Sequence, residues 1–339
     1  MRTFRGAFRV SHRNGHGTRV VSGAILFDGA KVERLEELPL PLRSRRLRGS
    51  KLLWVDIDRA EASADEVAAA FDLDDGTRGR LSSSESHAVF EDYGRYLHVT
   101  TYSPLEADED ELVALECVVG ENWVVTAHDR PLEVLDEFAH RVSGSGDTGA
   151  LDGPSFLATL LEWVLGAYSA ALERVEQRLE EFDVQAMRGQ GDEEDIERLI
   201  AERRRVGTLR RALAAHRSAL TALTHPELEA LGNHASGERF ESLLRRFEAT
   251  VQEARDAKEA IVGSFDVLIA RTGHTTNHVM KLLTLTSVIL LPGALLAGLM
   301  GMNFQLGLFT YNWIFYLVVA IDIAIAAVAL GVARYKDWI

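Results

Sequence analysis

The chain has 339 residues, of which 37 are Lys or Arg and 51 are Asp or Glu, so its formal net charge is −14. Nucleic-acid phosphates select basic surfaces, and this acidic balance therefore argues against a nucleic-acid-binding protein. The single cysteine, Cys117, excludes an intrachain disulfide framework and a cysteine-based zinc site, and its apolar surroundings predict a buried thiol.

Residues 1–142 predict a cytoplasmic α/β domain, because short apolar runs alternate with helical patterns. Runs rich in β-branched and aromatic residues predict strands at 52–57, 96–102, 112–119 and 123–127. A helix is expected at 63–71, where Ser63 provides the cap and Glu66 follows three residues later. The acidic run 106–111 is interpreted as a solvated hairpin end, with cation binding as the alternative.

Residues 143–154 are rich in Ser and Gly and predict a linker. After it, residues 155–281 predict a stalk of long helices, which cover 155–188, 193–224 and a segment that starts near 237 and continues to 302. At 1.5 Å per residue the last of these is about 100 Å long. A helix of that length needs neighbours along its flanks, so the apolar stripes are interpreted as a coiled-coil core.

Two apolar stretches near the end of the chain predict a transmembrane hairpin. Residues 282–302 carry no charge and, at about 21 residues, match a hydrocarbon core of about 30 Å. Residues 313–333 form the second span, with Asp322 as their only charge, and 303–312 form the turn between the spans.

Basic residues predict the orientation of this hairpin. Arg271 and Lys281 precede the first span, Arg334 and Lys336 lie in the tail 334–339, and the turn has neither Lys nor Arg. The positive-inside rule therefore places both termini in the cytoplasm and the turn outside. The N-terminus lacks the apolar stretch of a signal peptide, which agrees with a protein of the inner, cytoplasmic membrane.

The first span ends in Gly301-Met302-Asn303, and the segments 277–284 and 291–293 precede this motif. These residues, at the outer end of the penultimate span and before a short turn, resemble the CorA metal-ion transporter family. The resemblance implies an α+β cytoplasmic domain followed by long stalk helices and a two-helix transmembrane hairpin, assembled as a homopentameric funnel. It also implies that the first membrane helices line a central pore for Mg²⁺ or Co²⁺. A zinc-transporting branch, the ZntB proteins, shares the architecture.

The resemblance makes Gly301, Met302 and Asn303 the selectivity motif. Mg²⁺ gives up its water reluctantly, so a ring of neutral Asn303 amide oxygens suits a hydrated ion. Neutral acceptors also hold the ion loosely enough to release it. The alternative role for Asn303 is a helix C-cap, which asparagine favours.

The resemblance further implies a pore-lining face on the first membrane helix and its cytoplasmic extension. Asp266 lies eleven residues before Asn277 and shares its face, where related proteins carry an aspartate ring at the pore neck. Apolar constrictions that gate by dewetting are expected at Met280 and Leu291, with packing or lipid contact as the alternative. The predicted pore-lining residues are Asp266, Asn277, Met280, Thr284, Ser287, Leu291 and Gly298.

Three titratable residues have open roles. His274 and His278 are four residues apart, a spacing that can hold Zn²⁺, but no third ligand is near them in the sequence, and surface histidines are the alternative. Asp322 is costly in lipid and is expected to hydrogen-bond a neighbouring helix, with proton coupling as the alternative.

Three functions remain open at this point. The first is a divalent cation channel for Mg²⁺, Co²⁺ or Ni²⁺, the second a proton-coupled Zn²⁺ importer of the ZntB type, and the third a membrane-anchored coiled-coil scaffold. The outer turn departs from the family, since 305–308 lack the Met-Pro-Glu of many magnesium transporters, and this leaves the ion open. No enzyme and no cofactor are expected, and the expected partners are further copies of the chain, divalent cations and the lipid membrane.

Overall fold

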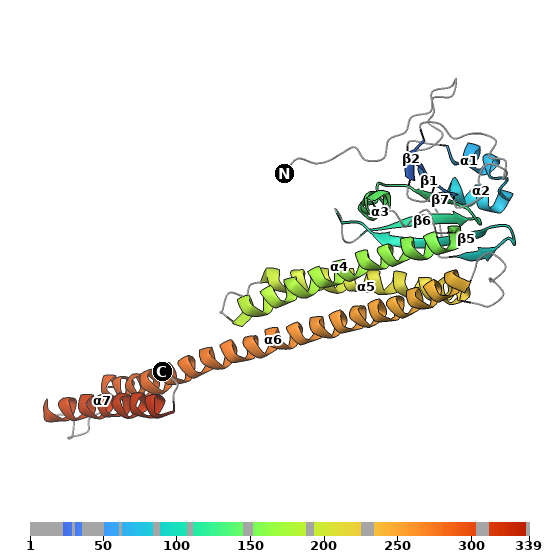
Figure 1. Ribbon diagram of the computed structural model, residues 1–339. Coiled ribbons are helices and arrows are strands. Elements are labelled where there is room, and N and C mark those ends of the chain that lie inside the picture. Colours follow the sequence, from blue (N-terminus) through green and yellow to red (C-terminus); the bar gives the residue numbers. More distant parts are fainter. Residues whose placement is uncertain are drawn as a thin grey trace. The chain divides into compact units, whose positions relative to one another are not determined.

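The computed structural model describes residues 23–28, 31–35, 51–60, 63–83, 89–106, 111–144, 152–187, 193–224, 234–302 and 312–336. The chain forms two compact units. One comprises Met1–Phe182 and Asp192–Val262, and the other comprises Asp183–Gly191 and Gly263–Ile339. The first contains a β-sheet, short helices and three long helices, and the second contains the two apolar spans (Figure 1).

In the described part of the chain, the sheet of the first unit has seven strands in the order β2-β1-β3-β7-β6-β5-β4. Among these described strands, only β3 and β7 pair in parallel, and the remaining neighbours are antiparallel. The central strands are buried on both faces, which explains why they read as continuous apolar runs. The strands are β1 (Gly23–Asp28), β2 (Lys31–Arg34), β3 (Lys51–Asp58), β4 (Phe90–Asp92), β5 (Leu97–Pro104), β6 (Leu112–Val119) and β7 (Trp123–His128).

Helices cover both faces of the sheet (Figure 1). On one face, α1 (Ala64–Ala70) and α2 (Asp75–Leu81) pack on residues such as Leu53 and Val125. On the other face, the Trp54 ring contacts Phe138 of α3 (Glu133–Gly144) and Phe156 of α4 (Gly153–Met187), with ring centroids 5.5 and 5.4 Å apart. The core is therefore a three-layer sandwich centred on β3.

The four predicted strands and the predicted helix at 63–71 are confirmed, with ends that move by up to two residues. Sequence reasoning missed β1, β2, β4, α2 and α3. β2 and β4 are short edge strands without a fully buried residue, and they carry little apolar signal. α2 contains two glycines, which weaken its helical pattern.

The predicted linker, 143–154, overlaps a helix at each end, because α3 continues to Gly144 and α4 begins at Gly153. The N–H of Gly153 donates to the carbonyl oxygen of Glu121 at 2.7 Å, in the turn between β6 and β7. A Cβ atom on Gly153 would stand 2.0 Å from the carbonyl oxygen of Gly120, so only glycine fits there. Residues 145–151 of the predicted linker lie outside the described part of the chain.

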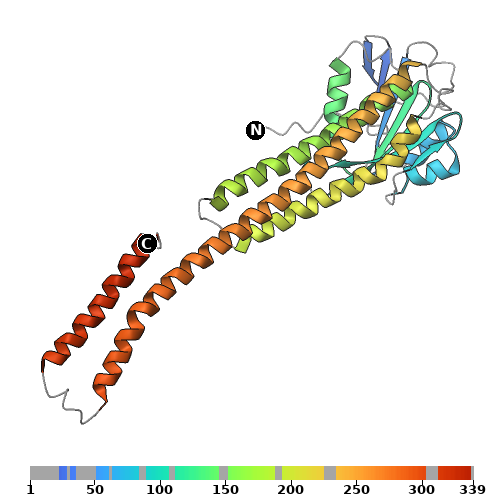
Figure 2. The same cartoon turned by 90° about the horizontal axis from the view of Figure 1, so that it is seen from below.

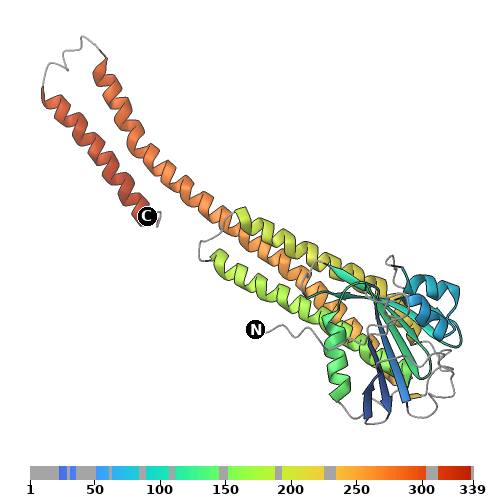
Figure 3. The same ribbon diagram turned by 90° about the horizontal axis from the view of Figure 1, so that it is seen from above.

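Three long helices run side by side in the first unit (Figures 2 and 3). They are α4, α5 (Glu193–Leu223) and the first part of α6 (His234–Gly301). Buried residues recur at alternating spacings of three and four, which confirms the predicted coiled-coil core. On α5 they are Leu199, Glu202, Val206, Leu209, Leu213, His216, Leu220 and Leu223; on α6 they are Phe240, Leu243, Phe247, Thr250, Ala254, Ala257, Ile261 and Ser264.

His216 attaches α5 to the sheet. Its Nε2 accepts a hydrogen bond from the backbone N–H of Tyr102 at 2.8 Å, and its ring stacks on the Tyr102 ring. On α4, the Tyr168 hydroxyl donates to the carbonyl oxygen of Tyr102 at 3.0 Å. Burial lowers the pKa of His216 from 6.5 to about 4, which keeps the imidazole neutral and able to accept.

This lowered pKa predicts an acid-dependent loss of stability. As the pH falls below 6.5, His216 binds a proton in the unfolded chain, whereas in the folded chain it stays neutral until about pH 4. The free energy of unfolding therefore decreases as the pH falls from 6.5 to about 4. The loss is about 3 kcal/mol, from 1.36 kcal/mol per pKa unit. We expect His216→Gln to unfold with a shallower dependence on pH in this window, measured by denaturant titration of the full chain. A slope equal to that of the wild type would contradict the assignment, and His140→Gln, at an exposed histidine of α3, is the matched control.

Candidate functional site

Three helices of the described chain are long and apolar enough to cross a membrane: α4, α6 and α7 (Asn312–Tyr335). The apolar window of α4 is 61% buried, because it packs on the sheet and on the other long helices of the first unit. The windows of α6 and α7 are 0% buried. The apolar surface of these two helices is therefore available to lipid or to other copies, as expected for the hairpin.

Within the second unit, α6 and α7 run side by side (Figures 2 and 3). One face of α6 is half-buried along its membrane stretch, at Leu285, Ile289, Pro292, Leu296 and Met300. A groove of about 580 Å³ lies between the helices and is lined by apolar side chains such as Val288 and Ile325, with Thr284 at its edge.

All seven predicted pore-lining residues are exposed in the single chain. The side chains of Met280 and Leu291 are 61% and 68% exposed. Helical geometry places this stripe and Gly293, which contacts α7, on opposite sides of α6. Thr284 differs from the other six because it also lines the groove toward α7.

Two hydroxyls on this stripe are already hydrogen-bonded within the helix. Thr284 donates to the carbonyl oxygen of Met280 at 2.7 Å, and Ser287 donates to that of Leu283 at 2.8 Å. Donation to the backbone leaves the lone pairs of both hydroxyl oxygens directed outward as acceptors. A stripe with such acceptors suits the water shell of a hydrated cation.

The predicted selectivity motif lies at the end of α6. Gly301 is the last helical residue, and the N–H of Met302 donates to the carbonyl oxygen of Leu299 at 3.3 Å. Gly301 and Met302 are both exposed. Asn303 and the outer turn up to 311 lie outside the described residues, so the role of Asn303 stays a prediction.

The described residues contain no cluster of three or more His, Cys, Asp or Glu side chains suited to a metal ion. Asp266, His274 and His278 are exposed on α6. In one chain, Asp266 thus offers a single carboxylate, and a metal site there would need further copies of the chain.

Carboxylates also gather on the first unit. A pocket of about 330 Å³ is lined by Glu106, Glu133, Glu137 and Glu162. The backbone N–H of Glu106 donates to Glu133 Oε2 at 3.0 Å, and Glu111, at the other end of the acidic run, pairs with Arg130. Residues 107–110 of the run lie outside the described residues. These side chains are at least partly exposed to water, which weakens their pull on a cation.

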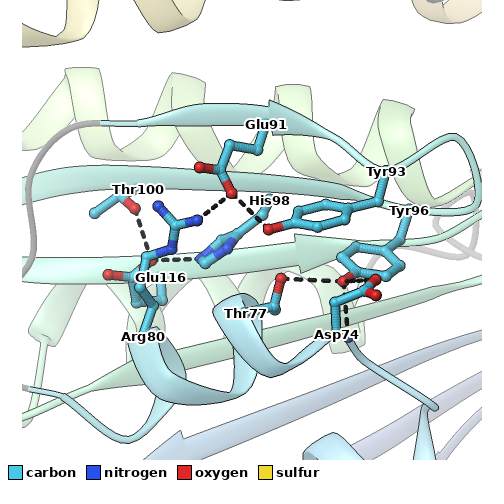
Figure 4. A network of polar contacts seen from close by, with 9 residues as sticks. All are labelled: Asp74, Thr77, Arg80, Glu91, Tyr93, Tyr96, His98, Thr100 and Glu116. Atoms are coloured by element: carbon cyan, nitrogen blue, oxygen red, sulfur yellow. Dashed lines mark hydrogen bonds and ion pairs between the residues drawn. The ribbon is translucent and has the colours of Figure 1, made fainter.

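A polar network lies between α2 and the sheet (Figure 4). Glu116 Oε2 lies 2.7 Å from His98 Nε2 and accepts a hydrogen bond from Thr100 Oγ1 at 2.7 Å. Beside them, Arg80 pairs with Glu91, and this ion pair lowers the pKa of the Glu91 carboxyl. These polar groups are hydrogen-bond or ion-pair partners of one another. The network is therefore a structural feature of the sheet.

Asp322 faces the neighbouring helix, as expected, but its Oδ1 has no hydrogen-bond partner among the described residues, and sequence reasoning did not identify the residue that it meets. The Asp322 carboxyl group is packed against Gly293 on α6. A glycine directly after the only proline of the first span was the available signal, because it leaves room for a neighbouring side chain.

Metal-ion transport proteins match this chain over most of its length. The protein-family model of the CorA-like Mg²⁺ transporter protein matches residues 49–335. The cobalt/magnesium transport protein CorA of Methanocaldococcus jannaschii is 24% identical over 326 residues, which cover 93% of this chain and 98% of that protein. The complete structure of the CorA magnesium transporter from the same organism matches with a TM-score of 0.75 and 22% identity, over 93% of this chain and 98% of that one. The zinc transport protein ZntB of Cronobacter sakazakii is 23% identical over 210 residues, or 57% of this chain and 58% of that protein.

Proposed function

This chain belongs to the CorA-like Mg²⁺ transporter protein family, which confirms the resemblance found in the sequence, and from this premise we propose that it conducts divalent metal cations across the membrane. The observation that carries the proposal is the exposed stripe on α6 that runs from Asp266 through Asn277 to Gly298. The similarity of the chain to CorA and ZntB proteins supports divalent cations as the cargo.

Several copies of the chain are needed for this function. Thr284 and Ser287 are exposed on one face of α6 within its membrane stretch, and polar groups are costly when they face hydrocarbon. An arrangement of copies around one axis removes this cost, because it turns the stripe toward a water-filled path. The family resemblance sets the proposed number of copies at five.

We propose Mg²⁺ as the principal ion, with Co²⁺ or Ni²⁺ as further cargo. Carbonyl and water oxygens suit Mg²⁺, whereas imidazole and thiolate suit zinc. The described part of the stripe offers the Asp266 carboxylate, amide and hydroxyl oxygens and the Met280 thioether, and His278 lies about 100° around the helix from Asn277. A proton-coupled Zn²⁺ importer remains the second candidate, supported by the similarity to ZntB.

The proposed mechanism is passive conduction. The membrane potential contributes roughly 2.3 kcal/mol per elementary charge per 100 mV, and a divalent ion carries two charges. The hydrated ion is captured by the Asn303 amides at the outer mouth and passes the hydroxyl acceptors of Thr284 and Ser287. The apolar rings at Leu291 and Met280 close the path by dewetting.

A pair of neighbouring cysteine substitutions tests the pore. Leu291 and Leu290 are 68% and 64% exposed but point about 100° apart around α6. We expect a charged thiol reagent to block metal flux into liposomes through Leu291→Cys and to leave flux through Leu290→Cys unchanged. The native Cys117 is fully buried, and burial raises the pKa of its thiol, so it contributes little background reaction.

Equal block of the two variants would contradict the assignment of the pore face. The same liposomes, loaded with Mg²⁺, Co²⁺ or Zn²⁺ with and without a pH gradient, distinguish the two candidate functions. Zn²⁺ flux that requires the pH gradient would contradict the Mg²⁺ channel and support the proton-coupled importer as the function.

A further inference from the structure

Asp322 lies at the middle of the membrane hairpin. It follows Asn312, the first residue of α7, by ten residues, or about 15 Å along a helix that crosses a core of about 30 Å. Gly293 is at a matching depth of α6, eleven residues after the start of the uncharged span at Leu282. This depth is the most costly one for a charged side chain.

The carboxyl group of Asp322 is packed against the backbone of Gly293. A Cβ atom built on Gly293 would stand 2.9 Å from Oδ2 and 3.1 Å from Oδ1 of Asp322. The carboxyl group thus fills the space that a larger residue at position 293 would need. Oδ1 is buried and has no hydrogen-bond partner among the residues that the structure describes.

Pro292 lies inside α6, directly next to this contact. Its nitrogen carries no hydrogen, so the carbonyl oxygen of Val288, four residues earlier, lacks the donor that a regular helix supplies. In hydrocarbon such an acceptor needs another donor. The centre of the hairpin therefore combines a carboxyl oxygen without a partner and a segment of backbone with a spare acceptor.

No counter-charge is near Asp322 on either helix. On α6 the nearest charged residue is Lys281, twelve residues or about 18 Å before Gly293. On α7 it is Arg334, at the same spacing after Asp322, and the nearest other titratable residue is Tyr316, six residues before it. A metal ion would need further ligands that these described stretches lack. A proton needs none.

We propose that Asp322 is a proton-binding site whose occupancy sets the contact between α7 and α6 at Pro292 and Gly293. With a proton bound, the carboxyl group is neutral and has an O–H donor that faces the proline segment. Without the proton, a charged oxygen faces backbone and apolar side chains, and the contact between the helices weakens. Proton uptake thereby controls how α7 supports the helix that lines the pore, a consequence that rests on the proposed function.

Infrared spectroscopy tests the site without reference to transport. The full chain, with aspartate labelled with ¹³C in its carboxyl group, is reconstituted in liposomes and titrated with pH. We expect a carboxylic-acid band that titrates in the wild type and is missing from Asp322→Asn. Protonated aspartates elsewhere in the chain remain in both spectra. Identical spectra of the two proteins over the whole titration would overturn the proposal.

A glycine pair provides a second test if Asp322→Asn does not assemble. Gly293→Ala displaces the carboxyl group and is expected to shift the frequency of the band and its titration. Gly331→Ala on α7, where a Cβ atom meets nothing within 4 Å, is expected to leave both unchanged. A band that is insensitive to Gly293→Ala would place the titrating carboxyl group elsewhere and overturn the proposal.

Transport measurements then test the coupling. We expect the pH dependence of metal flux to flatten in Asp322→Asn, over the range in which the infrared band titrates in the wild type. An unchanged flux profile beside a titrating band would overturn the coupling alone. A wild-type protein without any metal flux would overturn the proposed function, while the infrared result would still decide the proton site.

Discussion

Asn303→Ala is expected to reduce divalent cation flux to background while the assembled protein remains intact. The amide of Asn303 is the proposed first acceptor for the hydrated ion, and the substitution removes it from every copy at once. Mg²⁺ holds its water tightly, so capture depends on acceptors arranged for the hydrated ion. Flux of Mg²⁺ and Co²⁺ into liposomes, with the native mass of the assembly in mild detergent, measures both parts of the expectation.

Asn312→Ala is the matched control, since Asn312 begins α7 at the other end of the same turn. Its flux is expected to stay near that of the wild type. Wild-type flux through correctly assembled Asn303→Ala would show that the residue only caps the helix. A smaller assembly in Asn303→Ala would instead assign it to contacts between copies.

The fold was predictable where patterning is strong. The central strands β3, β5, β6 and β7 are largely buried on both faces, and the long helices repeat their buried positions every three or four residues. Such signals depend on neighbours in the sequence alone. β2 and β4 lie at the two edges of the sheet and owe their structure to pairing with β1 and β5. Their pattern is weak because edge strands bury few side chains.

The candidate site was also predictable from the sequence only in part. The exposed face of α6 with Met280 and Leu291 followed from helical spacing together with the family resemblance, and both side chains are exposed in the structure. The contact of Asp322 with Gly293 joins residues 29 positions apart on two helices. Helical spacing within one span does not determine which residues meet across the hairpin. The role of Asn303 still rests on the resemblance.

The buried polar groups of the sheet were also beyond sequence reasoning. His98, Thr100 and Glu116 belong to strands that read as apolar runs, and each is at most 1% exposed. The register of β5 and β6 pairs Thr100 with Glu116 directly and brings His98 to the same face (Figure 4). Only this register shows that His98 and Thr100 both contact the Glu116 carboxyl group.

Glu116→Met is accordingly expected to destabilise the first unit by about 3 kcal/mol or more, the usual cost of leaving one partner of a buried pair behind. The substitution removes the carboxyl oxygen that lies 2.7 Å from both His98 Nε2 and Thr100 Oγ1, and both groups stay buried. Denaturant unfolding of the full chain, followed by tryptophan fluorescence, measures the loss, because Trp54 and Trp123 lie in this sheet. Glu121→Met, at an exposed glutamate of the adjacent turn, is the control and is expected to change stability by less than about 0.5 kcal/mol.

The triple variant His98→Leu, Thr100→Val and Glu116→Met separates the cost of lost partners from the value of the network itself. Replacing every buried polar member by apolar groups of similar size is often neutral or stabilising, whereas removal of one member is not. We therefore expect the triple variant to recover most of the stability that Glu116→Met loses. If it stays as unstable as Glu116→Met, the polar network contributes net stability of its own, and these hydrogen bonds, rather than the absence of unpaired groups, stabilise the pairing of β5 with β6.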